Sequence, residues 1–162
     1  MNIKRISAML CTIAVLLSCT ACGVSKNGST DLYDTEPETQ LTEEDNMFRL
    51  EIKVGDQTFS ATLYDNEAAK ALIARLPMTL DMSELNGNEK YCYLDGSLPT
   101  YSAVPPGIET GDIMLYGNSC LVLFYKSFST SYSYTPLGRI DDADRLDAVL
   151  GDGGVQITFS LG

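Results

Sequence analysis

Apolar and polar residues alternate along residues 48–54 and again along residues 58–63. Successive side chains of a strand point to opposite faces, so this period predicts two strands with one face in a core and one in water. Gly55 and Asp56 lie between them and form the kind of two-residue turn that joins the strands of a hairpin. Residues 155–161 alternate in the same way and predict the last strand of the domain.

A helical period interrupts this alternation in two places. After the first hairpin, Asp65 or Asn66 can cap a helix whose apolar residues fall at i, i+3, i+4 and i+7, namely Ala69, Leu72, Ile73 and Leu76. Near the end of the chain, Asp141 or Asp142 can cap a second helix, with inward-facing apolar residues Leu146, Val149 and Leu150. The sequence therefore predicts one early and one late helix.

Five shorter strands are predicted between these helices, over residues 78–82, 90–94, 113–115, 120–125 and 138–140. Residues 95–110 show no such pattern, and loops of this length in a compact domain are often functional. A sheet closed on itself has no exposed edges. We therefore predict a mainly β domain over residues 47–162, a closed eight-stranded β-barrel capped by two helices.

Residues 126–136 form a loop rich in Ser, Thr and Tyr, and seven of the nine tyrosines lie between Tyr91 and Tyr134. Tyrosine combines a large contact area with a polar tip, and binding residues are common on loops. These side chains either bind an extended peptide or small ligand or seal the rim of the barrel. Glu89 likewise either lines a pocket or lies in a surface turn. The candidate ligand-binding residues are Phe124, Tyr125, Ser127, Tyr132, Tyr134 and Arg139.

Four motifs follow one another along the domain: Leu85–Tyr91, Gly111-Asp112-Ile113, Leu121–Ser127 and Gly138-Arg139-Ile140. The last of them directly precedes the late helix. This order resembles the small bacterial cyclophilin-like family, relatives of the peptidyl-prolyl isomerases. The resemblance implies that the barrel is a cyclophilin-like one.

The resemblance implies less about activity. Cyclophilins surround a substrate proline with phenylalanines, a tryptophan, a histidine and an arginine, but this chain contains neither tryptophan nor histidine. Arg75 precedes the expected strand and Arg139 lies in a different element, so the resemblance assigns the catalytic arginine to no residue of this chain. We therefore expect ligand binding without catalysis. The rival hypothesis is a divergent peptidyl-prolyl cis-trans isomerase, and a purely structural envelope module is a third.

The composition excludes several kinds of site. A Ser-His-Asp hydrolase and a zinc site both lack their histidines. Residues 141–147 carry four aspartates but not the glycine and terminal glutamate of a calcium loop, so helix capping is their expected role. No metal or cofactor is expected. Cys92 and Cys120 lie in apolar strands, where cysteine is more often a small buried apolar residue than half of a disulfide, so we expect free thiols.

The first 18 residues are typical of a bacterial lipoprotein signal peptide. Lys4 and Arg5 precede the uncharged, mostly apolar run Ile6–Leu17, which is too short to span a bilayer as a helix. Leu16-Leu17-Ser18-Cys19 resembles a lipobox, in which the thiol receives diacylglycerol. We favour Cys19 as the lipidated residue and keep Cys22 as the alternative, in which case the signal ends at residue 21.

Residues 19–46 combine many acidic residues with few apolar ones, a composition that favours a disordered tether. Loss of Lys4 and Arg5 with the signal changes the net charge from −11 to −13. Such a surface repels nucleic acid and anionic headgroups. We therefore expect no nucleic-acid partner, and attachment to the extracytoplasmic face of the cell membrane through the lipid anchor, where peptides or exported proteins are the potential partners.

Overall fold

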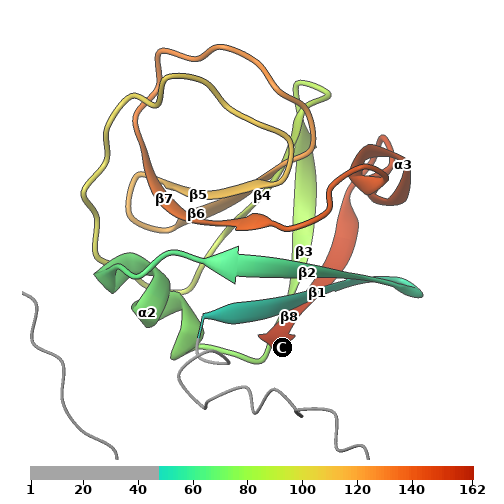
Figure 1. Cartoon of the computed structure of the whole chain (residues 1–162), viewed down its shortest axis with the longest axis horizontal. Helices are drawn as coiled ribbons and strands as arrows, with labels where there is room; N and C mark the ends of the chain where they lie inside the picture. Colours follow the sequence, from blue (N-terminus) through green and yellow to red (C-terminus); the bar gives the residue numbers. More distant parts are fainter. Residues whose placement is uncertain (1–47) are drawn as a thin grey trace, which may run out of the picture. The chain divides into compact units, whose positions relative to one another are not determined.

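The computed structural model describes residues 48–162, which form eight strands and two short helices (Figure 1). The predicted signal peptide, Cys19, Cys22 and the predicted tether lie outside the described residues. Within residues 48–162, no helix has the length and apolar character needed to cross a membrane.

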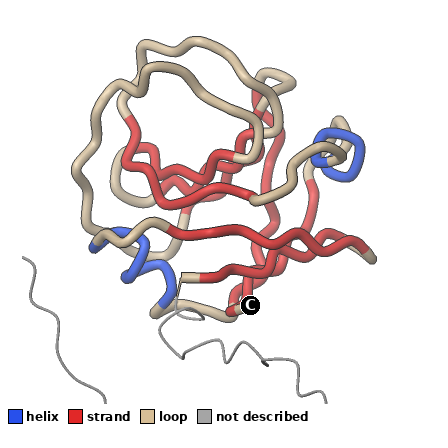
Figure 2. The backbone as a smooth tube through the Cα atoms, viewed as in Figure 1, coloured by secondary structure: helices blue, strands red, loops and turns tan. Residues whose placement is uncertain are grey.

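The strands are β1 (Arg49–Val54), β2 (Gln57–Leu63), β3 (Met78–Leu85), β4 (Glu89–Tyr93), β5 (Asp112–Tyr116), β6 (Cys120–Phe124), β7 (Tyr134–Ile140) and β8 (Val155–Leu161). The helices are α2 (Glu67–Ile73) and α3 (Leu146–Leu150). Every strand pairs antiparallel with two neighbours in the order β1-β2-β7-β5-β6-β4-β3-β8, and β8 pairs with β1. The predicted closed eight-stranded barrel with two helices is confirmed (Figure 2).

The predicted start of the seventh strand is wrong. The strand predicted over residues 138–140 is β7, which begins at Tyr134 and includes Pro136. Pro136 lies beside a shift in the β5–β7 register, between Ile113 and Met114, and irregularities of this kind tolerate a residue that cannot donate to the ladder. Because proline is normally a signal against a strand, the sequence pattern places the start of β7 too late.

The aspartates expected to cap the second helix do not do so, because α3 begins only at Leu146 and its N-cap is Arg145. Asp141 instead accepts a hydrogen bond from the Thr62 hydroxyl (2.7 Å), and Asp142 accepts one from the backbone N–H of Asp144 (3.2 Å). These bonds tie the segment before α3 to β2 and to itself. The first helix is capped by Asn66, one of the two predicted caps, whose Oδ1 accepts from the N–H of Ala69.

The sheet formed by β4, β6, β5 and β7 is covered on both faces. On β6, Leu121 and Leu123 point into the main core, whereas Val122 and Phe124 belong to a second apolar cluster on the outer face. Because both faces of β6 are buried, its sequence is an unbroken apolar run rather than an alternation of apolar and polar residues. The outer cluster forms part of the floor of the candidate site.

Cys92 and Cys120 are free thiols, as expected. Cys92 pairs in register with Leu121, and Cys120 with Tyr93. Adjacent register positions place the two side chains on opposite faces of the sheet, with Cys92 against the main core and Cys120 in the outer cluster. A disulfide between them would require the backbone to rearrange.

Candidate functional site

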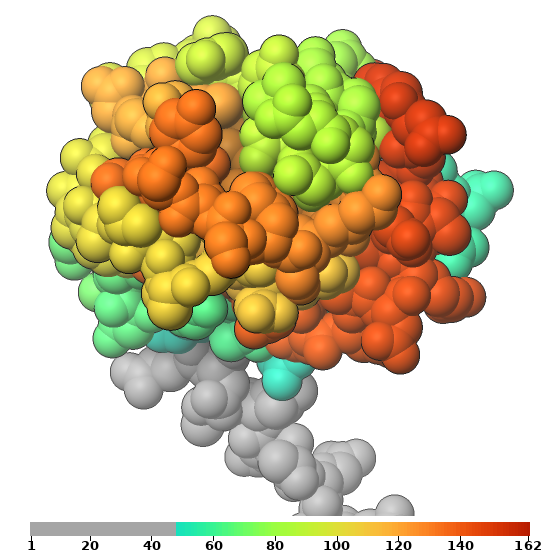
Figure 3. All heavy atoms as spheres, turned by 90° about the horizontal axis from the view of Figure 1, so that it is seen from above, coloured from blue at the N-terminus to red at the C-terminus, as the bar shows by residue number. Residues whose placement is uncertain are grey.

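A cavity of about 500 Å³ opens on the outer face of β4, β6 and β5. Two long loops, residues 95–110 and 126–133, arch over the same end of the barrel (Figure 1). Seen from above, the yellow and orange segments form much of the surface there, with the light-green β3–β4 turn beside them (Figure 3). The cavity is lined by Leu85, Asn86, Asn88, Glu89, Tyr91, Tyr93, Tyr116, Cys120, Val122, Phe128, Ser129, Thr130, Ser131, Tyr132 and Tyr134.

Backbone hydrogen bonds hold the two loops together. Ile108 and Phe128 exchange N–H to carbonyl bonds of 2.9 and 3.0 Å, and Ala103 and Tyr134 exchange two of 3.0 Å. The long irregular stretch predicted over residues 95–110 therefore acts as a brace for the loop that carries the cavity wall. These paired backbone segments restrict the positions of Phe128 and Tyr134, which both line the cavity.

Aromatic rings form the walls of the cavity. Tyr116 packs edge-on against Tyr132 with 6.0 Å between ring centroids, and at a tilt against Tyr134 at 5.6 Å. Tyr91 and Tyr93 meet edge-on at 6.2 Å. Because side chains alternate along a strand, Glu89, Tyr91 and Tyr93 of β4 share the outer face. One strand thus supplies both a carboxylate and two rings.

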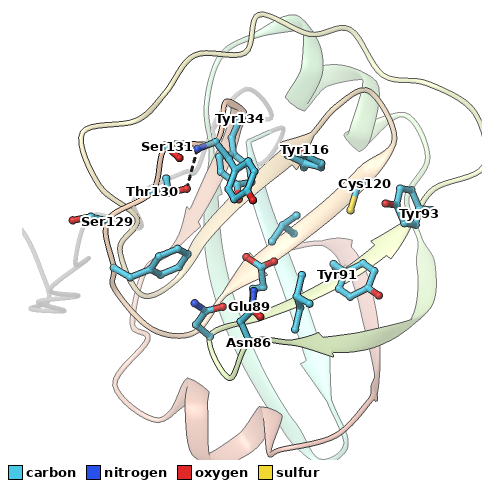
Figure 4. Close-up of a pocket in the computed structure, with 15 residues that line it drawn as sticks. Asn86, Glu89, Tyr91, Tyr93, Tyr116, Cys120, Ser129, Thr130, Ser131 and Tyr134 are labelled. Atoms are coloured by element: carbon cyan, nitrogen blue, oxygen red, sulfur yellow. Dashed lines mark hydrogen bonds between the residues drawn. The ribbon is translucent and has the colours of Figure 1, made fainter.

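Glu89 lies in the floor of this cavity, with Asn86 and Tyr91 on one side and Tyr134 and Thr130 on the other (Figure 4). Only 8% of the residue is exposed, and within residues 48–162 its carboxylate has neither a hydrogen-bond donor nor an ion-pair partner that meets ordinary distance limits. Burial raises the pKa of the Glu89 carboxyl, and the charge of Glu84 raises that pKa further. The site therefore holds a carboxyl group that is largely buried, has no counter-charge and keeps its oxygens open to the cavity.

Two other lining groups, Tyr134 and Cys120, are held in their neutral forms near pH 7. Burial, followed by the charge of Glu89, raises the pKa of the Tyr134 hydroxyl to about 12 and that of the Cys120 thiol to about 11. A second polar atom also lacks a partner: Asn88 Oδ1 is buried and accepts no hydrogen bond from any described residue. The cavity thus presents the Glu89 carboxylate and no positive charge of its own, whereas Asn88 Oδ1 is closed off from it.

A buried lysine next to Glu89 points the opposite way, into the barrel. Lys90 is fully buried, and its Nζ donates to Glu84 Oε2 (2.6 Å) and to the carbonyls of Gly151 (2.7 Å) and Gly153 (2.6 Å). The hydroxyl of Tyr125 also donates to Glu84 Oε2 (2.7 Å). We call Lys90, Glu84 and Tyr125, with the two carbonyls, the lysine anchor.

The lysine anchor fixes one rim of the cavity. Glu84 Oε1 accepts from the N–H of Gly87 (2.7 Å), which belongs to the β3–β4 turn that contributes Asn86 and Asn88 to the lining. Burial opposes ionisation of Glu84, but hydrogen bonds from Lys90, Tyr125 and Gly87 and the Lys90 charge outweigh it, so the pKa of Glu84 is lowered. An ionised Glu84 therefore holds the turn.

The six predicted ligand-binding residues do not form one site. Tyr132 and Tyr134 line the cavity, and Phe124 lies beneath it, fully buried, with its ring 5.5 Å from that of Tyr134. Tyr125 is buried in the lysine anchor, although it also borders a second hollow. Ser127 and Arg139 lie at that hollow and do not line the cavity that contains Tyr132 and Tyr134.

The second hollow is open and polar, and its predicted residues already have partners. Ser127 Oγ donates to Glu109 Oε2 (3.0 Å) and accepts from the N–H of Thr110 (2.9 Å). Arg139 donates to the carbonyl of Thr110 (3.4 Å), and its Nε lies 3.8 Å from Asp112 Oδ1. These contacts stabilise the turn before β5 rather than leaving side chains free for a ligand.

Sequence reasoning left several lining residues out of the candidate set. Tyr91, Tyr93 and Tyr116 lie on strands, and only the pairing of β4, β6 and β5 brings their rings to one face. Glu89 was open to two interpretations, and the structure places it in the cavity. The available signal was the alternation Glu89, Tyr91, Tyr93, which puts three such residues on one side of a strand.

A family model for the cyclophilin-like family matches residues 52–160, which include all eight strands in whole or in part. The chain belongs to the cyclophilin-like family. Among solved structures, the cyclophilin-like chain is similar to a hypothetical protein, AF2241 from Archaeoglobus fulgidus, determined in solution. The two share 19% identity over 71% of this chain and 95% of that one, with a TM-score of 0.49. No curated protein matches.

This cyclophilin-like cavity lacks the polar groups that the resemblance associates with prolyl isomerisation. The chain contains no histidine or tryptophan, and no arginine is among the lining residues. Arg139 lies at the second hollow. Arg75 donates to the carbonyls of Asp95 (2.9 Å) and Ser97 (2.8 Å), so it holds the start of the long loop instead.

Proposed function

We propose that this protein is a lipid-anchored, extracytoplasmic binding protein whose cavity takes an extended peptide or a small ligand without catalysis. The observation that carries the proposal is the cavity of about 500 Å³ walled by tyrosines. Ligand sites are concave, largely apolar and of this size, with a few polar groups that fix orientation. Tyrosine suits such walls because it offers large contact area and a hydroxyl.

The proposed location is supported by the sequence of the first residues. Lys4 and Arg5, the apolar run Ile6–Leu17 and the lipobox-like Leu16-Leu17-Ser18-Cys19 support export and acylation. A diacylated cysteine carries two chains, which suffices for stable membrane attachment. Mass spectrometry of the membrane form tests this part. A diacylglycerol adduct at Cys19 supports it, and an unmodified, released chain contradicts it.

Binding is tested by titrating the full chain with short peptides while tyrosine fluorescence is recorded. The chain has no tryptophan, and five of its nine tyrosines line the cavity, so tyrosine emission is sensitive to binding there. Tyr132→Ala removes a wall residue that is 61% exposed, and Tyr64→Ala removes a tyrosine that is 44% exposed and lies outside the cavity. We expect Tyr132→Ala to weaken binding and Tyr64→Ala to leave it unchanged. Equal effects of both variants would contradict the site.

An isomerisation assay on a proline-containing peptide separates binding from catalysis. Prolyl isomerisation requires no general base, only weakened amide resonance, so absence of histidine does not decide the matter. We expect no acceleration over the uncatalysed rate. Clear catalysis that is lost in Arg139→Ala or Arg75→Ala would overturn the non-catalytic proposal in favour of a divergent peptidyl-prolyl isomerase.

A further inference from the structure

The uncompensated carboxylate of Glu89 defines what the cavity can hold. A buried carboxylate normally has a counter-charge or several hydrogen-bond donors, because burying it alone is unfavourable. The neighbouring cations are already engaged elsewhere. Lys90 points into the barrel and bonds to Glu84, and Lys126 Nζ lies 5.6 Å from the centroid of the Tyr125 ring. Within residues 48–162, neither cation is available to Glu89.

The aromatic walls favour the same kind of group. The face of an aromatic ring carries negative potential and attracts a cation within about 6 Å of its centroid. Tyr116 packs against both Tyr132 and Tyr134 on one wall, and Tyr91 packs against Tyr93 on another. An anion in this space would meet both the ring faces and Glu89, and would be repelled by each.

Hydrogen bonding narrows the class of cation further. The two carboxylate oxygens of Glu89, in the floor of the cavity, accept hydrogen bonds and have no donor among the described residues. A group that carries positive charge and N–H donors satisfies both the charge and the acceptor oxygens of Glu89, whereas a quaternary ammonium satisfies only the charge. The charge, the rings and the acceptor oxygens therefore favour one kind of ligand group.

We propose that the ligand presents a single positively charged nitrogen group with N–H donors, an ammonium or a guanidinium, which sits over Glu89 between the tyrosine walls. This inference rests on the proposed binding function. The group can belong to a free amine or to a lysine or arginine side chain of a polypeptide. Both sources share the recognised chemistry, and the experiment separates them.

The test is calorimetric titration of the full chain with matched compounds. N-acetyl-lysine methylamide is compared with its neutral isostere, N-acetyl-norleucine methylamide, and with N-acetyl-trimethyllysine methylamide. n-Butylamine represents the free amine. We expect the lysine compound to bind roughly ten- to a hundredfold more tightly than the norleucine compound, as for a charge-assisted hydrogen bond made in a desolvated site. The affinity for the trimethyllysine compound should lie between those for the lysine and norleucine compounds.

Two variants locate the effect. Glu89→Gln should bring the affinity for the lysine compound down to that for norleucine, while weak binding of both persists. Glu51→Gln removes the same charge from β1, outside the cavity, and should change neither affinity. Equal affinities of n-butylamine and the lysine compound indicate a free amine as sufficient ligand, and tighter binding of the lysine compound indicates a polypeptide. Either result supports the cationic class.

Failure of the cationic inference can be distinguished from failure of the proposed binding function. If norleucine binds as tightly as lysine, or if Glu89→Gln leaves the preference for lysine intact, the cationic inference is overturned while the proposed binding function stands. If none of the compounds binds the full chain and none perturbs its tyrosine fluorescence, both the inference and the proposed site are overturned.

Discussion

Replacing Lys90 with methionine tests whether the lysine anchor holds the barrel end beneath the cavity. Methionine fills a similar volume but removes the ammonium that donates to Glu84 and to the carbonyls of Gly151 and Gly153. The substitution leaves the two glycine carbonyls without the lysine donor and Glu84 Oε2 with the Tyr125 hydroxyl alone. It therefore isolates the polar contribution of Lys90 from its packing.

The expected loss follows from the burial of the two partners. Removing one partner of a buried ion pair costs about 3–5 kcal/mol. The side chain of Lys90 is fully buried, but that of Glu84 retains 20% exposure, so water can partly resolvate the remaining carboxylate. We therefore expect the lower end, about 3 kcal/mol. For a domain of this size this corresponds to a fall in Tm of about 12 °C.

Urea unfolding of the full chain, followed by circular dichroism, measures the loss. Lys53→Met on the exposed face of β1 is the matched control and should change the free energy of unfolding by less than about 0.5 kcal/mol. The double variant Lys90→Met/Glu84→Gln should lose less than the sum of the two single variants, since the pair is coupled. A loss for Lys90→Met no larger than for Lys53→Met would refute the anchor.

Three further predictions concern the contact between β2 and β7 and the two glutamates Glu84 and Glu89. Gly138→Ala should destabilise the domain by about 1–3 kcal/mol, because a Cβ there would lie 2.5 Å from the Thr62 carbonyl oxygen. Gly153→Ala, where a Cβ meets no atom within 4 Å, is its control, and equal losses in thermal unfolding would contradict the argument. The lowered pKa of Glu84 predicts a stability contribution that is present above its unfolded pKa and is lost as pH falls through the folded pKa. The free energy of unfolding of Glu84→Gln should therefore fall less steeply than that of the parent as the pH is lowered. An unchanged slope would count against the stabilising role of ionised Glu84. The raised pKa of Glu89 has the opposite sign, because the folded state holds the proton more tightly and loses stability as pH rises through the shifted range. Glu89→Gln should accordingly be more stable than the parent at pH 7. The difference in the free energy of unfolding should vanish at pH values below the ordinary pKa range of carboxyl groups. A variant less stable than the parent at pH 7 would show that Glu89 is not a buried carboxyl group without a partner.

The strands that face water on one side could be predicted from the sequence, because their alternation is local. β1, β2 and β8 show this pattern and appear where it predicts them. β7 could be predicted only in part. Its first residues lie in a Ser- and Tyr-rich run, and their pairing with β5 depends on a register irregularity that no local pattern signals.

The cavity was harder to predict because its parts are distant in the sequence. Glu89 lies beside a turn, where carboxylates are usually solvated, and becomes buried only because residues 126–133 fold over β4. Lys90 is a comparable case. A charged residue rarely faces a core, and the partners of Lys90 lie in two distant segments, at residue 84 in β3 and at residues 151 and 153 in the loop before β8. The abundance of tyrosine identified the region of the candidate site, but it did not indicate which tyrosine rings line the cavity.

The position of a bound cation tests the proposed site most directly. The decisive measurement is a crystal structure of the full chain soaked with N-acetyl-lysine methylamide. We expect the ligand nitrogen at hydrogen-bond distance, about 2.7–3.2 Å, from the Glu89 carboxylate, with tyrosine rings around it. A ligand bound at the hollow beside Arg139, or residues 126–133 packed onto the floor with the cavity closed, would contradict it.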